Sequence, residues 1–179
     1  MNNKLKIISI IILILILFHL KQFLKRNNKY EILQINNKIN NFDKYFNENL
    51  PIVLKGYNIE MVRDNLSPLT IKKNNIDKFN IENLYMTHCR YNLFIYSQNE
   101  IKINISTPDQ YNNFEFNKYK YPIKLLNSKS NSFSSISILL RPGNLLHIPR
   151  FWILNLEKNL DISIFYSETI FSYFFTKLK

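Results

Sequence analysis

The chain is predicted to fold as a mainly β domain, a β-sandwich or barrel, behind an N-terminal transmembrane helix. The first observation is a strongly apolar run at residues 7–20, IISIIILILILFHL, which has the composition of a membrane helix. The second is a series of short strand-like segments at residues 133–166, a spacing that favours a sandwich or barrel over a parallel α/β sheet. The third is Pro142-Gly143, which predicts a tight turn joining two antiparallel strands, because proline presets φ and glycine accepts a positive φ.

The apolar run is interpreted as a membrane anchor formed by residues 5–24. A helix over residues 7–20 rises about 21 Å, which is less than a hydrocarbon core of about 30 Å. The flanking residues supply the missing length if the amines of Lys6 and Lys21 reach out to the headgroups. A cleaved signal peptide is the main alternative, but the following residues KQFLKRNNK offer no small-residue cleavage site. A buried helix of a soluble protein is the weaker alternative, because nothing else in the chain would cover it.

Charge and cysteine content predict that the C-terminal part lies in the cytosol. The basic residues after the run outnumber Lys4 and Lys6 before it, as the positive-inside rule requires of a cytosolic side. The single cysteine, Cys89, excludes an intrachain disulfide framework and agrees with a reducing compartment. Sequons at Asn65 and Asn104 would permit the lumen. The predicted organisation is an anchor with a basic flank at residues 1–29 and a β domain at residues 30–179.

Between the anchor and residue 92, the pattern predicts one helix and few strands. Apolar residues recur at helical spacing through residues 30–47, which predicts an amphipathic helix lying on the domain. Pro51 opens an apolar run to Tyr57 and predicts a strand. Residues 69–71 suggest another strand, and the polar residues 72–80 suggest none.

The second half of the chain is predicted to hold most of the strands. Residues 93–96 and 101–105 flank a polar turn and predict a β-hairpin. Loops are expected at two polar segments, residues 111–121 and 127–135. Further strands are expected at residues 133–140, 144–148, 151–156 and 160–166. Ser167 is expected to cap a C-terminal helix, with Glu168 in its first turn.

A more specific pattern surrounds the predicted turn at Pro142-Gly143. It covers residues 139–156, LLRPGNLLHIPRFWILNL. They resemble the second signature of the JmjC/cupin-like 2-oxoglutarate oxygenases. The matching residues are Pro142, Gly143, Leu145, Leu146, Ile148, Pro149 and Trp152. LPIVLKG at residues 50–56 resembles an early strand of the same family. The resemblance covers roughly residues 50–166 and implies a double-stranded β-helix, or jelly roll.

The resemblance also implies where a metal site would lie, and the chain departs from it there. The family holds Fe(II) with two histidines and a carboxylate, a set that leaves positions open for 2-oxoglutarate and oxygen. Leu154 stands where the family has its last metal-binding histidine, and Asn144 stands in place of an aspartate. Aligning His88 with the first histidine puts Arg90 on the metal-binding aspartate, and a cation there repels a metal. Aligning the family's asparagine with Asn92 instead puts Met86 on the histidine and His88 on the aspartate.

What remains is a candidate vestigial pocket rather than a metal site. By position in the resemblance its residues are His88, Asn92, Lys102, Trp152 and Leu154. Lys102 stands near the lysine that pairs with the cosubstrate carboxylate in that family. His147 is expected to be a hydrogen-bonded or exposed strand histidine. No catalytic residue, metal ligand or cofactor is therefore predicted.

Three functions are weighed. The favoured one is a non-catalytic, membrane-tethered descendant of the family that acts as a binding or structural module. The second is a hydroxylase that uses Fe(II) and 2-oxoglutarate with displaced ligands. The third is a viral membrane protein of virion assembly, because the bias towards Asn, Ile and Lys is typical of AT-rich genomes such as those of some large DNA viruses. The motifs G-x-S-x-G, H-E-x-x-H and paired CxxC do not occur.

Partners are predicted from charge and from the C-terminal segment. The net charge is +11, yet the lysines are scattered among asparagines, so no specific nucleic-acid binding is expected. The apolar residues of the predicted C-terminal helix cover more of its circumference than in a surface helix, which keeps its far side polar. This apolar surface would fit a homodimer interface, the membrane surface, or burial by the domain itself.

Overall fold

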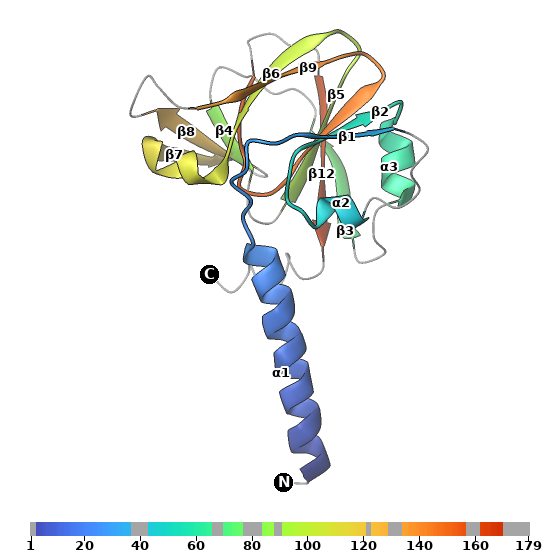
Figure 1. Ribbon diagram of the computed structural model, residues 1–179, viewed down its shortest axis with the longest axis vertical. Helices are drawn as coiled ribbons and strands as arrows, with labels where there is room; N and C mark the ends of the chain where they lie inside the picture. The colour runs from blue at the N-terminus through green and yellow to red at the C-terminus, as the bar shows by residue number, and fades with distance from the viewer. Residues whose placement is uncertain are drawn as a thin grey trace.

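A computed structural model of the chain describes residues 3–36, 43–65, 70–76, 84–87, 91–120, 123–128, 134–156 and 162–169. Helix α1 (Asn3–Leu24) projects away from a domain built of β-strands (Figure 1). The described strands form two six-stranded sheets. The mainly β prediction is thereby confirmed.

Helix α1 presents apolar side chains on every side. Its large apolar residues are 42–59% exposed, and they are Leu5, Ile7, Ile8, Ile10, Ile11, Ile12, Leu13, Ile14, Leu15, Ile16, Leu17 and Phe18. Among the described residues, no helix combines the length and the hydrophobicity needed to cross a membrane.

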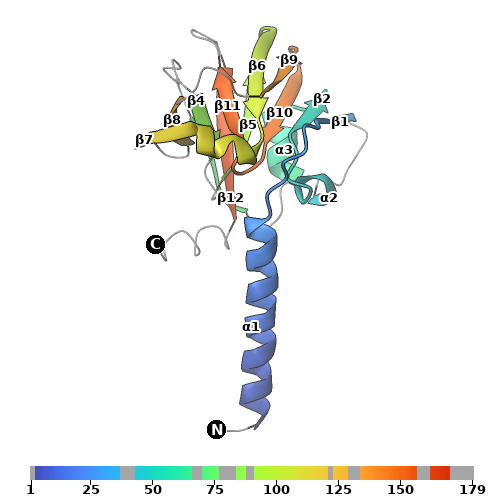
Figure 2. The ribbon, with the colours of Figure 1, turned by 60° about the vertical axis from the view of Figure 1, so that its left-hand side comes forward.

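The first sheet contains, in spatial order, β1 (Leu33–Asn36), β2 (Ile52–Lys55), β10 (Asn144–Ile148), β5 (Tyr91–Ser97), β12 (Ile162–Thr169) and β3 (Thr70–Ile76). The second sheet contains β7 (Phe114–Lys120), β8 (Ile123–Ser128), β4 (Leu84–Thr87), β11 (Ile153–Leu156), β6 (Ile101–Ser106) and β9 (Ile136–Leu140). All pairings are antiparallel except that of β1 with β2. Figure 2 shows the sheets from a second side.

The strand pairs follow a nested order. If β7 and β8 are set aside, the strands from β3 to β12 pair first with last, β3 with β12, and then β4 with β11. Inside these pairs, β5 lies beside β10 and β6 beside β9. Strands β7 and β8 pair with each other, and β8 extends the second sheet beyond β4.

Two predicted turns connect the sheets instead of forming hairpins. Asn144 N donates to Arg141 O at 3.1 Å, and Gly143 has a φ of 76°, so the expected tight turn is present. It joins β9 of the second sheet to β10 of the first, and these strands share no ladder. The predicted hairpin of residues 93–96 and 101–105 is wrong for the same reason, because β5 and β6 lie in different sheets. Their apolar faces meet across the core, so the two segments do not pair edge to edge.

Successive side chains of a strand point to opposite faces of its sheet, and the first sheet therefore has an apolar core on each face. The intersheet core lies between the sheets and includes Leu93, Ile95, Ile103, Leu146 and Trp152. The outer core lies on the other face of the first sheet, where α2 (Asp43–Phe46) and α3 (Ile59–Asn65) contribute to its cover. It includes Ile35, Ile52, Leu54, Tyr57, Val62, Phe94, Leu145 and Phe165. The predicted burial of Trp152 between the sheets is confirmed, with an exposed fraction of 0%.

The structure corrects several local predictions. The amphipathic helix expected at residues 30–47 is wrong, because residues 33–36 form β1, which pairs with β2, and of the described residues in this range only 43–46 are helical. The polar residues 72–76 belong to β3, and most of the expected loop at 111–121 is the strand β7.

The C-terminal segment departs from its prediction where the structure describes it. Ser167 and Glu168 continue β12 and pair with β5, so they do not begin a helix there. Residues 170–179 lie outside the described residues, and the dimer proposed through them stays a prediction.

Candidate functional site

The position that the family resemblance gives to a metal-binding histidine lies in the intersheet core. Leu154 lies on β11, in register with Ile105 of β6 and Tyr85 of β4, and its exposed fraction is 1%. Leu154 has no lone pair to offer a metal, and among the described residues it lies in the same core as the apolar side chains of Ile103, Ile105 and Trp152.

The remaining residues of the candidate pocket are not gathered around Leu154. Side chains alternate along a strand, and in β6 the buried ones are those of Ile101, Ile103 and Ile105. Lys102 is therefore on the opposite face of β6, and it is exposed. Asn92 shares its face of β5 with Phe94 of the outer core, whereas Leu93 faces the intersheet core.

The structure thus brings together only Trp152 and Leu154 of the predicted pocket. His88 lies outside the described residues, as do Cys89 and Arg90. Within the described ranges, no group of three or more His, Cys, Asp or Glu side chains could hold a metal ion.

His147 occupies an environment that the sequence did not predict. It lies on β10 with an exposed fraction of 0%, and its ring centroid is 4.5 Å from that of Phe46 and 5.0 Å from that of Phe94. Neither ring nitrogen has a hydrogen-bond partner among the described residues. Burial, with a contribution from the charge of Arg150, lowers the pKa of His147 from 6.5 to about 3. The expectation of a hydrogen-bonded or exposed histidine is therefore wrong, and the imidazole is neutral at pH 7.

A separate cleft of about 480 Å³ opens between β9 and the β1–β2 edge of the first sheet. Its lining includes the basic residues Lys55 and Arg141 and the apolar residues Val53 and Ile138. Arg141 Nε lies 3.6 Å from Glu100 Oε2, and both side chains are largely exposed. None of the predicted pocket residues lines this cleft.

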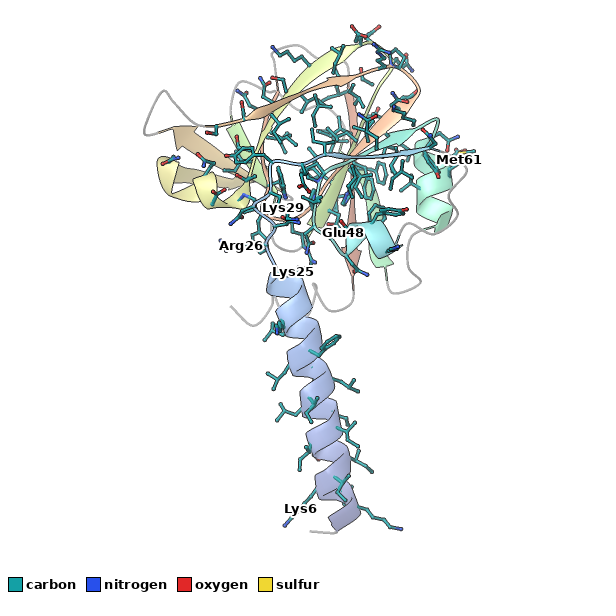
Figure 3. The ribbon with its side chains drawn as sticks, in the orientation of Figure 1. Lys6, Lys25, Arg26, Lys29, Glu48 and Met61 are labelled. Atoms are coloured by element: carbon teal, nitrogen blue, oxygen red, sulfur yellow. The ribbon has the colours of Figure 1, made fainter. Side chains whose placement is uncertain are left out.

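Several side-chain hydrogen bonds lie where α1 meets the β domain. Trp152 Nε1 donates a buried hydrogen bond to Asn49 O at 3.1 Å, and Asn49 Nδ2 donates to Lys25 O at 3.2 Å. Asn27 Nδ2 donates to Glu48 O at 2.9 Å, and Lys29 N donates to Asn27 Oδ1 at 3.1 Å. The segment that follows α1 is therefore bonded to the domain at Lys25 and Asn27, and Figure 3 shows Lys25 and Glu48 near the end of α1.

An aromatic contact and two residues with positive φ also lie where α1 meets the β domain. The guanidinium carbon of Arg26 lies 4.6 Å from the centroid of the Phe151 ring, within the range of a cation–π interaction. Asn49 has a φ of 54° and Phe151 a φ of 71°, and these are the described non-glycine residues with positive φ. Asparagine tolerates that region, but a bulky aromatic residue there costs roughly 1–2 kcal/mol.

Comparison with models of known protein families and with curated proteins found no match to this chain.

The contacts between residues 25–29, 48–49 and 151–152 are here named the anchor junction. The IPRFW segment that resembles the family signature takes part in it, because Phe151 contacts Arg26 and Trp152 donates to Asn49 O. Sequence reasoning missed Arg26 and Asn49. No local pattern links them to Trp152, which contacts Asn49 across 103 positions of the chain.

Proposed function

We propose that the chain is a membrane-anchored, non-catalytic relative of the cupin/JmjC-like oxygenases, and that its β domain acts as a binding or structural module. The observation that carries the proposal is the exposure of apolar side chains on every side of α1. A soluble surface helix keeps one face polar, whereas a helix that is apolar all round needs an apolar environment. Lipid acyl chains supply such an environment without requiring a partner protein.

The length of the apolar run is compatible with an anchor that thins the bilayer locally. The run is shorter than a typical hydrocarbon core, and short spans are accommodated by bilayer thinning and by flanking lysines that reach the headgroups. Lys6 lies near the free end of α1, and Lys25 lies at its junction with the domain (Figure 3). The excess of basic residues at the junction supports a cytosolic β domain.

The nested strand order supports a jelly roll. In that fold eight strands form two packed sheets, with Greek-key connections between them. The pairing of β3 with β12, β4 with β11, β5 with β10 and β6 with β9 is the pairing expected of such a fold. Strands β1, β2, β7 and β8 would then be additions at the edges of the two sheets.

The packing around Leu154 supports the absence of oxygenase chemistry. A facial triad needs three ligands converging on one metal. By the resemblance Leu154 stands in place of one of them, and it is 1% exposed in the largely apolar intersheet core. The domain would then contribute its surface rather than an active site.

A metal-binding experiment tests the non-catalytic part of the proposal. The full chain in detergent micelles, incubated with Fe(II), ascorbate and 2-oxoglutarate, is expected to retain no stoichiometric iron and to form no succinate above a protein-free control. The physical reason is the missing ligand at Leu154. Succinate formation that is lost in His88→Ala but kept in His147→Leu would instead establish the hydroxylase with displaced ligands.

A flotation experiment tests the anchor. The full chain is expected to float with phosphatidylcholine vesicles after an alkaline carbonate wash. Ile11→Lys/Leu15→Lys is expected to remain at the bottom of the gradient, because each lysine near the centre of a membrane helix costs about 2.5–3.5 kcal/mol. Met61→Lys, a change at an exposed position of α3, serves as the control and should float like the native chain. Release of the native chain by carbonate would rule out the anchor.

A further inference from the structure

A concentrated basic surface surrounds the point where α1 enters the β domain. Its members, named the basic collar, are the exposed residues Lys21, Lys25, Arg26 and Lys29. No acidic residue occurs between positions 21 and 30, and Glu48 is the acidic residue of the anchor junction. Figure 3 shows Lys25, Arg26 and Lys29 together at the top of α1, on the side of the domain that faces the helix.

The basic collar is attached to the domain rather than carried on a free linker. The backbone of Lys25 accepts a hydrogen bond from Asn49, and the ring of Phe151 lies under the guanidinium of Arg26. Asn27 also binds the backbone of Glu48. A ligand that binds the basic collar is therefore next to the side of the domain formed by residues 48–49 and 151–152.

We propose that the basic collar binds the headgroups of anionic lipids and thereby fixes which side of the β domain lies against the membrane. This inference rests on the proposed anchoring, which brings the basic collar to the headgroup layer. Basic residues next to a membrane segment are attracted to anionic lipids, and each contributes roughly a fivefold preference near the surface. The attraction is Coulombic and falls off within a Debye length of about 10 Å at 0.1 M salt.

The chain contains its own reporter for this contact. Trp152 is the single tryptophan, and it is two hydrogen bonds away from Lys25 through Asn49. Energy transfer from Trp152 to dansyl-labelled lipid therefore measures which lipids gather at the anchor junction. The full chain is reconstituted in vesicles with equal small fractions of dansyl-phosphatidylserine or dansyl-phosphatidylcholine.

The comparison uses two variants with the same loss of charge. Lys25→Gln/Lys29→Gln removes two charges from the basic collar and keeps the backbone hydrogen bonds that Lys25 O and Lys29 N make. Lys55→Gln/Lys102→Gln removes two exposed charges from β2 and β6 of the β domain. For the native chain and the β-strand variant, transfer to the serine lipid should exceed transfer to the choline lipid at low salt. The excess should fall severalfold in the collar variant and disappear in 1 M NaCl, where the Debye length is about 3 Å.

The outcomes separate this inference from the anchoring on which it rests. Equal transfer to both lipids, unaffected by salt or by the collar variant, would leave the anchor in place and overturn the lipid preference. Absence of transfer to either lipid would overturn the anchor itself. Inorganic phosphate that suppresses the preference more than NaCl of the same ionic strength would identify a site for free phosphate and overturn the lipid assignment.

Discussion

The free energy of unfolding is expected to fall steeply as the pH drops below 6.5, because of the buried His147. Its pKa is about 3 in the folded chain and 6.5 when exposed. Between these values the unfolded chain binds a proton that the folded chain does not, so stability is lost as the pH falls. Each pH unit costs about 1.4 kcal/mol, and the whole window costs on the order of 5 kcal/mol. Such a loss is comparable to the total stability of many domains.

The contribution of His147 is isolated by comparing the native chain with His147→Leu. Urea unfolding of both chains in the same detergent, followed by circular dichroism from pH 8 to pH 4, gives the two pH profiles. Acidic side chains contribute equally to both and cancel in the difference. The native chain should lose stability relative to the variant below pH 6.5, while above it the difference should be constant. Parallel profiles over the whole range would show that the imidazole is solvated or hydrogen-bonded in solution.

Replacement of Trp152 is expected to produce the other large effect. Its indole is fully buried between the sheets, and truncation of such a side chain to alanine typically costs about 3–5 kcal/mol. Trp152→Phe should cost less in packing but removes the donor to Asn49 O. A buried carbonyl left without its partner costs about 1–3 kcal/mol.

The measurement uses urea unfolding followed by far-ultraviolet circular dichroism, because both variants lack the only tryptophan. Trp152→Phe serves as the variant that still folds if Trp152→Ala does not. Met61→Ala, at a position 46% exposed, is the control and should stay within about 0.5 kcal/mol of the native chain. Stability of Trp152→Phe equal to that of the native chain would argue against the bond to Asn49.

The sequence revealed the strands whose pattern is local and failed where the partner is distant. Strand β10 was predicted with its observed bounds, because a turn precedes it and Pro149 follows it. The helical spacing of Ile32, Ile35 and Ile39 predicts a helix at residues 30–47. Leu33 and Ile35 also alternate as in a strand, and only the parallel pairing with β2 decides between the two patterns. The alternation of Phe114 and Phe116 around Glu115 was a strand pattern that the polar surroundings obscured.

In the candidate site, too, features that depend on distant residues could not be predicted from the local sequence. The leucine at position 154, where the family resemblance expects a histidine, was visible in the sequence, since it depends on residue type alone. The outward direction of Lys102 could be found only when Ile101 and Ile103 were seen to occupy the core. The burial of His147 depends on Phe46 and Phe94, which come from separate elements, so no window around the histidine could have indicated it.

The nested pairing also has a consequence for synthesis. Strand β12 lies between β5 and β3 in the first sheet and is the last described strand to leave the ribosome. The first sheet therefore cannot close until β12 has been synthesised, and folds rich in such distant pairings form slowly, in milliseconds to seconds. An anchor at the front of the chain would already be engaged with lipid by then. We expect the earlier strands of the first sheet to stay unpaired until then, and unpaired strand edges are prone to aggregation.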